Sequence, residues 1–167
     1  MMTKRSTKIL LLPLALLLLT GMRQEKHILT APPGQPADER AAQDRLPMSV
    51  DPVWQKFLAC KIGYNNKTGL YSIALTPDVK DLAGKTVSLN GFVLPLDGSD
   101  HTRHFLLTRR TPVCAFCPPG EPNEVVEIVS PKAILWTEKM VTVTGPVSLI
   151  NNGEKGMFFK INATAVQ

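Results

Sequence analysis

Alternation of apolar and polar residues governs the sequence from residue 86 to the C-terminus, and this period of two constrains the fold more than any other feature. The cleanest stretch sets Val141, Val143 and Val147 against Thr142 and Thr144. Because successive side chains of a β-strand point to opposite faces, such alternation predicts half-buried strands. Five short strands are expected, over residues 86–96, 103–108, 124–129, 140–149 and 157–166.

Two of the predicted strands carry a glycine in their middle, Gly91 and Gly145. A glycine inside a strand is typical of a bulge or a sharp bend. Short, curved strands separated by turns favour closure into a barrel. The sequence therefore predicts a mainly β fold, a small five-stranded closed or partly open barrel of the OB type. Residues 130–139 are short for the helix that such barrels usually carry between their third and fourth strands.

A short amphipathic helix is expected to precede the barrel. Ser49 or Asp51 can cap its N-terminus, and Pro52 suits its first turn. Apolar residues then recur at helical spacing and form a single stripe. The stripe consists of Val53, Trp54, Phe57 and Cys60. We expect the helix to end near Gly63 and residues 65–69 to form a loop.

The first 22 residues are typical of a targeting segment. Lys4, Arg5 and Lys8 form a positively charged start, and residues 9–19 are mostly leucine. This apolar run is shorter than the roughly 20 residues that a membrane-spanning helix needs. Met22 stands where a lipoprotein signal would place its cysteine. We therefore predict a signal peptide or N-terminal membrane anchor, export to the periplasm or the extracytoplasmic face of the inner membrane, and membrane association through this segment.

Residues 23–48 are rich in proline and charged residues and poor in large apolar ones, so little burial is available to offset the entropy of ordering them. We interpret this stretch as a disordered tether and residues 49–167 as the folded β-barrel domain. The chain carries 19 basic and 14 acidic residues, and three of the basic ones lie in the first 22 residues. The remaining 16 basic and 14 acidic residues leave a net charge of only +2, which argues against nucleic acid as a partner.

Cys114 and Cys117, in a proline-rich loop over residues 111–122, are the sharpest chemical feature of the sequence. Two thiolates three positions apart can bind one thiophilic metal ion, such as zinc or copper, or close a small disulfide. Plain loop thiols and thiol exchange are the remaining alternatives. Pro118 and the residues after it cannot continue a helix, which argues against the helix-activated thiolate of redox enzymes.

A metal site with two thiolates needs further ligands, and three other residues are candidates. Cys60 lies on the apolar stripe of the predicted helix, so its default interpretation is a small buried hydrophobe. His101 and His104 open the second strand, whereas the cysteines follow that strand. An extended strand rises about 3.3 Å per residue, so the histidines and the cysteines are expected at opposite ends of the barrel.

Several stretches together resemble an exported bacterial domain of unknown function. The run 81–87 leading into 91–96 resembles its L-x-G-K-x-V…G-F-x-x-P-L strand, and residues 105–107, 114–123 and 124–128 resemble its next strand, its cysteine–proline loop and the strand after it. The resemblance covers roughly residues 50–166. It implies the barrel fold and an envelope location, since many relatives are periplasmic proteins or lipoproteins linked to transport systems, some of which handle metal.

These observations lead to one expected function and its alternatives. We expect a non-enzymatic envelope protein whose Cys114/Cys117 loop binds zinc or copper, as an accessory of an envelope transporter or another membrane protein. The alternatives are a protein-interaction module with a structural disulfide, a thiol–disulfide redox protein, and an OB-type binder of nucleic acid or oligosaccharide. Exposed aromatic residues for stacking on bases are few, which weakens the last alternative.

Overall fold

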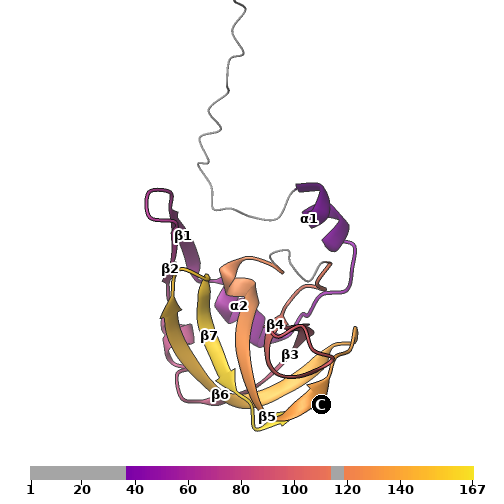
Figure 1. Ribbon diagram of the computed structural model, residues 1–167. Helices are drawn as coiled ribbons and strands as arrows, with labels where there is room; N and C mark the ends of the chain where they lie inside the picture. Colours follow the sequence, from indigo (N-terminus) through magenta and orange to yellow (C-terminus); the bar gives the residue numbers. More distant parts are fainter. Residues whose placement is uncertain (1–36, 114–118) are drawn as a thin grey trace, which may run out of the picture.

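The helices and strands of the computed structural model, which describes residues 37–113 and 119–167, follow one another as in Figure 1. The helices are α1 (Ala37–Gln43), α2 (Pro52–Leu58), α3 (Pro77–Lys80) and the 3-10 turn η1 (Pro122–Glu124). The strands are β1 (Lys61–Asn65), β2 (Leu70–Ala74), β3 (Thr86–Pro95), β4 (His101–Thr108), β5 (Val125–Leu135), β6 (Val141–Asn152), β7 (Met157–Asn162) and β8 (Ala165–Val166). The predicted targeting segment, residues 1–22, lies outside the described residues.

Five strands close into a barrel in the order β3-β4-β5-β7-β6, and β6 pairs back with β3. All these pairs are antiparallel except β5 with β7, which run parallel. This is the mixed five-stranded arrangement of the OB type, so the predicted fold class is confirmed. The predicted strands are placed correctly, but β5 continues to Leu135, through residues that we expected to be a connection.

The two mid-strand glycines lie where the barrel wall bends. β3 pairs with β6 through residues 86–91 and with β4 through residues 92–95, so it changes partner directly after Gly91. A Cβ atom on Gly91 would lie 2.7 Å from the carbonyl oxygen of Thr108. A Cβ atom on Gly145 would lie 2.3 Å from the carbonyl oxygen of Asn162. Both positions therefore need glycine because a neighbouring backbone approaches too closely for a side chain.

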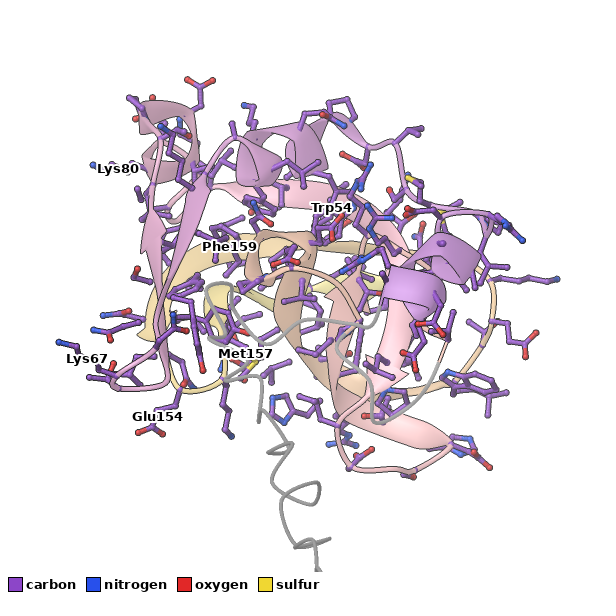
Figure 2. The ribbon with its side chains drawn as sticks, turned by 90° about the horizontal axis from the view of Figure 1, so that it is seen from above. Trp54, Lys67, Lys80, Glu154, Met157 and Phe159 are labelled. Carbon is purple, nitrogen blue, oxygen red and sulfur yellow. The ribbon has the colours of Figure 1, made fainter. Side chains whose placement is uncertain are left out.

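Helix α2 lies at one end of the barrel (Figure 1), and its two aromatic side chains belong to the hydrophobic core. Its N-terminus is capped as predicted, because the Asp51 carboxylate accepts a hydrogen bond of 2.9 Å from the Val53 N–H. Trp54 and Phe57 are fully buried, and the Phe57 ring stacks on Phe159 with ring centroids 4.1 Å apart. Figure 2 shows Trp54 and Phe159 inside the molecule, while Lys67 and Lys80 point away from it.

The predicted end of this helix is wrong. α2 ends at Leu58, and Gly63 lies instead in β1, which pairs with β2 as an antiparallel hairpin. The two strands have five residues each, and none of these residues is fully buried. Leu70 and Ala74 are apolar but exposed, so the alternating burial of β2 is not matched by an apolar–polar alternation in its sequence. Within the described residues, no helix has the length and apolarity that crossing a membrane requires.

The interpretation of residues 23–48 as a tether is wrong for residues 37–48. Residues 37–43 form helix α1, whose Gln43 contacts Thr111 and Pro119 of the barrel domain. Met48 forms a β-bridge with Arg110. The Gln43 side chain is 1% exposed, although α1 contributes no large apolar residue. Polar contacts therefore hold this segment to the domain; residues 23–36 of the predicted tether lie outside the described residues.

Candidate functional site

Cys114 and Cys117, the main predicted ligands, lie outside the described residues, as do the three residues between and after them. The structure does describe both flanks of their loop, residues 111–113 and 119–122. The environment of the thiols can therefore be built from these flanks and from the elements that hold them.

The side-chain amide of Gln43 joins the two flanks. Its Nε2 donates a hydrogen bond of 2.8 Å to the carbonyl oxygen of Thr111 and one of 3.3 Å to the carbonyl oxygen of Pro119. Its Oε1 accepts a hydrogen bond of 3.2 Å from Arg40, one turn earlier on α1. One buried side chain from the N-terminal segment thus brings the two ends of the cysteine loop to a common point.

A second set of contacts aligns residues 47–49 with the strand end that leads into the loop. The Ser49 N–H donates a 2.8 Å hydrogen bond to the carbonyl oxygen of Arg109. The Thr111 hydroxyl donates a 2.6 Å hydrogen bond to the carbonyl oxygen of Pro47. Residues 47–49 therefore run beside this strand end, with one antiparallel β-bridge between Met48 and Arg110.

Glu124, two residues after the second flank, is a buried carboxylate with several donors. The Arg109 Nη1 and the Arg110 Nε each lie 2.8 Å from its Oε1, and Arg40 lies 3.6 Å from its Oε2. The Glu121 N–H also donates to Oε2, at 3.1 Å, so the carboxylate closes the η1 turn. Only 4% of the Glu124 side chain is exposed. Ionic contacts thus join Arg109 and Arg110, just before the first flank, to Glu124, just after the second.

The charges in this cluster are balanced. Arg110 also pairs with Asp44, and Arg40 lies 3.9 Å from Glu121, so three guanidinium groups face three carboxylates. Burial of the Arg110 guanidinium opposes its charge, but its hydrogen bonds to Glu124 and Asp44 and the charges of both carboxylates outweigh burial and raise the pKa of Arg110 above its usual value. Little positive charge is therefore left over for an anion or a thiolate.

Cys60 is buried, with 3% of the residue exposed, and belongs to the hydrophobic core. Its Sγ lies 3.9 Å from the carbonyl oxygen of Lys56, one turn back along the chain. Its own carbonyl oxygen accepts a 3.1 Å hydrogen bond from Asn123, which follows the second flank. This burial matches the interpretation of Cys60 as a small hydrophobe; its role as a metal ligand stays a prediction.

His101 and His104 lie at the start of β4, whereas the cysteine loop follows the end of this strand. The His104 Nε2 lies 2.7 Å from the Glu127 carboxylate, which Lys160 also approaches at 3.5 Å. His101 is exposed and pairs in register with Leu135. Across residues 37–113 and 119–167, no three side chains of His, Cys, Asp or Glu are grouped so that they could hold a metal ion.

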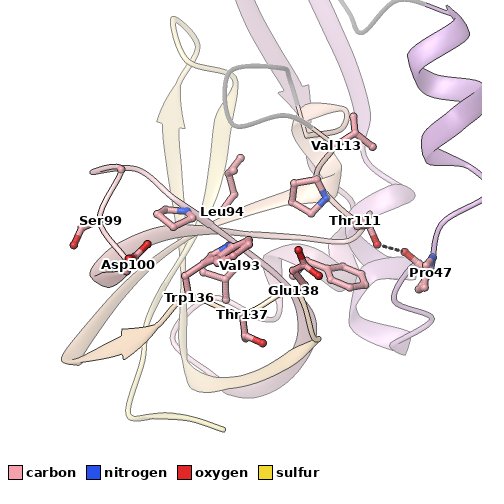
Figure 3. Close-up of a pocket in the computed structure, with 14 residues that line it drawn as sticks. Pro47, Val93, Leu94, Ser99, Asp100, Thr111, Val113, Trp136, Thr137 and Glu138 are labelled. Carbon is pink, nitrogen blue, oxygen red and sulfur yellow. Dashed lines mark hydrogen bonds between the residues drawn. The ribbon is translucent and has the colours of Figure 1, made fainter.

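A cavity of about 630 Å³ lies beside the first flank (Figure 3). It extends along the outer part of β3 and is bounded by the β3–β4 turn, by the first flank and by the residues that follow β5. Its lining includes Val113, the last described residue before the cysteines, and Pro47 of the N-terminal segment.

Sequence reasoning missed Gln43, Glu124 and this cavity. Gln43 lies in a polar stretch, and no local pattern distinguishes a glutamine that bonds two distant carbonyl groups from one that faces water. The pair Arg109–Arg110, directly after β4, binds Glu124. A signal was available in Glu121 and Glu124, whose spacing after a proline-rich loop is that of a capping box.

Residues 36–158 match the model of a family described as a protein of unknown function (DUF3299). Among solved structures, the crystal structure of a DUF3299 family protein from Pseudomonas aeruginosa PAO1, at 2.45 Å resolution, is similar, with 21% sequence identity and a TM-score of 0.47. The match covers 57% of this chain and 66% of that chain, slightly less than two thirds of its length. No curated protein matches the sequence. The matched region begins at residue 36, so it includes α1 and the cysteine loop.

Proposed function

The chain belongs to the DUF3299 family, whose function is unknown, and we propose that it is a non-enzymatic protein of the cell envelope that binds a thiophilic metal ion, zinc or copper, through Cys114 and Cys117. The observation that carries this proposal is the hydrogen bonding of one Gln43 side chain to both flanks of the cysteine loop.

Joined flanks favour metal binding for an entropic reason. Metal binding by a chelate site costs conformational entropy, because the ligands must be brought together. This entropy loss is smaller when the ends of the segment that bears the ligands are already held together. The contacts of Gln43 and Glu124 close the base of the cysteine loop without the metal ligands taking part. Thiolates three positions apart on such a segment can then bind the same ion with little further ordering.

The nature of the ligands selects soft metals. Cysteine thiolates prefer zinc and Cu⁺ over the hard cations Mg²⁺ and Ca²⁺. Zinc usually takes four ligands, so two positions would fall to Cys60, to backbone or water oxygens, or to a donor from another protein. A site that is incomplete within its own chain suits an accessory that passes an ion to an envelope transporter.

The positively charged and leucine-rich start of the chain supports an envelope location. We place the domain in the periplasm or at the extracytoplasmic face of the inner membrane, where residues 1–22 can keep it close to a membrane protein partner. An oxidising compartment also allows a disulfide between Cys114 and Cys117, which would make the loop a structural element of a protein-interaction module.

Thiol–disulfide exchange is less well supported than metal binding. A reactive thiolate usually owes its low pKa to a helix N-terminus or to a nearby unpaired cation. The nearest arginines, Arg109 and Arg110, pair with Glu124, and the η1 turn after the loop has only three residues.

A metal titration tests the proposal. Purified protein with reduced thiols is titrated with Zn²⁺ and with Cu⁺ under competition from a chelator, and the same is done for the Cys114→Ser/Cys117→Ser variant. We expect the double variant to bind at least 100-fold more weakly, because it lacks both thiolates. Cys60→Ser, which removes one thiol from the core, tests whether Cys60 is a further ligand: an affinity equal to that of the wild type would leave the remaining positions to backbone, water or partner donors.

Three other outcomes count against the metal site. Equal affinity of the wild type and the double variant would refute it. A pair of thiols that is bridged in the protein as isolated, and that resists a dithiol reductant, would support the structural disulfide. A pair that cycles readily between the two states would support the redox alternative.

A further inference from the structure

The cavity beside the first flank of the cysteine loop combines an apolar floor with a tryptophan and two carboxylates. Its floor is the outer part of β3, where Phe92, Val93 and Leu94 are at least 92% buried. Around this floor lie the β3–β4 turn, residues 111–113 and residues 136–138. Among the described residues, the lining consists of Pro47, Phe92, Val93, Leu94, Pro95, Gly98, Ser99, Asp100, Thr111, Pro112, Val113, Trp136, Thr137 and Glu138.

Apolar side chains remain accessible at the mouth of the cavity. Trp136 is 43% exposed and Val113 is 41% exposed, although both are large apolar residues. The backbone N–H of Trp136 donates a 2.8 Å hydrogen bond to the carbonyl oxygen of Asp100, which holds the tryptophan against the β3–β4 turn. An aromatic ring fixed at the edge of an apolar cavity is a surface that a ligand can cover.

The ionisable side chains that line the cavity among the described residues are all acidic. Asp100 and Glu138 are its two ionisable side chains, and no basic residue lines it among the described residues. Within the same part of the chain, neither carboxylate takes part in an ion pair. In the view of Figure 3, Trp136 lies between Asp100 and Glu138. An acidic, aromatic site on a chain with a net charge of +5 is unexpected on composition alone.

We propose that this cavity binds a small amphipathic organic cation, with an apolar body against Phe92, Val93 and Leu94 and a positive group against Trp136 and the two carboxylates. The volume, about 630 Å³, is in the usual range for small-molecule sites. A cation over the face of an indole ring is attracted by the ring quadrupole, and the attraction is strongest where water is partly excluded. The proposal is argued separately from the metal site, since it uses none of the cysteine side chains and rests on described residues alone.

The test compares two probes that have the same shape and opposite charge, tetraphenylphosphonium and tetraphenylborate. Binding to the full-length protein is followed by tryptophan fluorescence. Trp54 is fully buried and its Nε1 donates a 2.7 Å hydrogen bond to the carbonyl oxygen of Asn90, so a response to the probe should come from the exposed Trp136. We expect saturable binding of the phosphonium, with an affinity at least tenfold above that of the borate.

Variants show whether phosphonium binding depends on the side chains of this cavity. Asp100→Asn/Glu138→Gln should weaken phosphonium binding at least tenfold, and Trp136→Leu should abolish the fluorescence response. Asp78→Asn/Glu154→Gln removes two carboxylates that do not line the cavity and should change nothing. Cys114→Ser/Cys117→Ser should also bind the phosphonium normally, so a failed metal site and a failed cation site are distinguishable.

Three results would overturn the proposal. Equal binding of phosphonium and borate would show an apolar surface without charge selectivity. Unchanged phosphonium binding in Asp100→Asn/Glu138→Gln would remove the carboxylates from the site. Binding of a lysine-rich extended peptide without any binding of phosphonium would identify a protein-docking surface instead of a small-molecule site.

Discussion

Glu124→Gln is expected to lower the free energy of unfolding by about 3–5 kcal/mol, the usual cost of removing one partner from a buried ion pair. The glutamine keeps the size of the side chain but not its charge. Arg109 and Arg110, whose side chains are 14% and 18% exposed, would then be left without the carboxylate that both contact at 2.8 Å. Urea-induced unfolding followed by circular dichroism measures the change.

The matched control is Glu127→Gln on β5, where the side chain is 13% exposed. Glu127 also contacts two groups, His104 and Lys160, but these partners are 50% and 29% exposed. Ion pairs with exposed partners contribute about 1 kcal/mol or less, so this variant should be only slightly destabilised. Equal losses for the two variants would mean that the arginine cluster does not hold the base of the cysteine loop.

Phe57→Ala should cost a similar amount, about 3–5 kcal/mol, because it empties a fully buried position at the end of the barrel. It also removes the stacked contact with Phe159 and the edge-on contact with Trp54, whose ring centroid lies 5.9 Å away. Thermal and urea unfolding give the measurement.

Val53→Ala on the same helix is the control for Phe57. Val53 is half-buried and smaller, so its truncation should cost less than half as much. A decrease in the free energy of unfolding of less than about 1 kcal/mol for Phe57→Ala would indicate that packing of α2 against the barrel contributes little to stability.

The barrel could be predicted because the sequence features that indicate its strands lie within each strand. Alternation along residues 140–149 and the mid-strand glycines are visible within single strands, and the close backbone approaches at Gly91 and Gly145 explain why those positions carry no side chain. The start of α2 was equally accessible, since a capping Asp51 and a proline at the first turn are neighbours in sequence.

The base of the cysteine loop could not be predicted because its contacts are long-range. Gln43 lies 68 residues from Thr111 and 76 residues from Pro119. Composition assigned residues 37–48 to a tether, since ordering by burial requires large apolar residues. Here hydrogen bonds and ion pairs to Gln43, Arg40 and Asp44 supply the ordering energy instead.

The cavity was missed for the same reason. Asp100 and Glu138 lie in two turns far apart in sequence, and each is an ordinary polar turn residue when considered alone. Trp136 was assigned to a short connection, and its exposure becomes informative only once β5 is seen to reach Leu135 and to carry the tryptophan to the mouth of the cavity.

X-ray absorption at the zinc edge of the zinc-loaded protein identifies the atoms bound to the metal. We expect sulfur neighbours at about 2.3 Å in the wild type, and two fewer of them, replaced by nitrogen or oxygen, in Cys114→Ser/Cys117→Ser. A wild-type spectrum without sulfur neighbours, or a sulfur signal of undiminished amplitude in the double variant, would show that the two thiolates do not bind the metal.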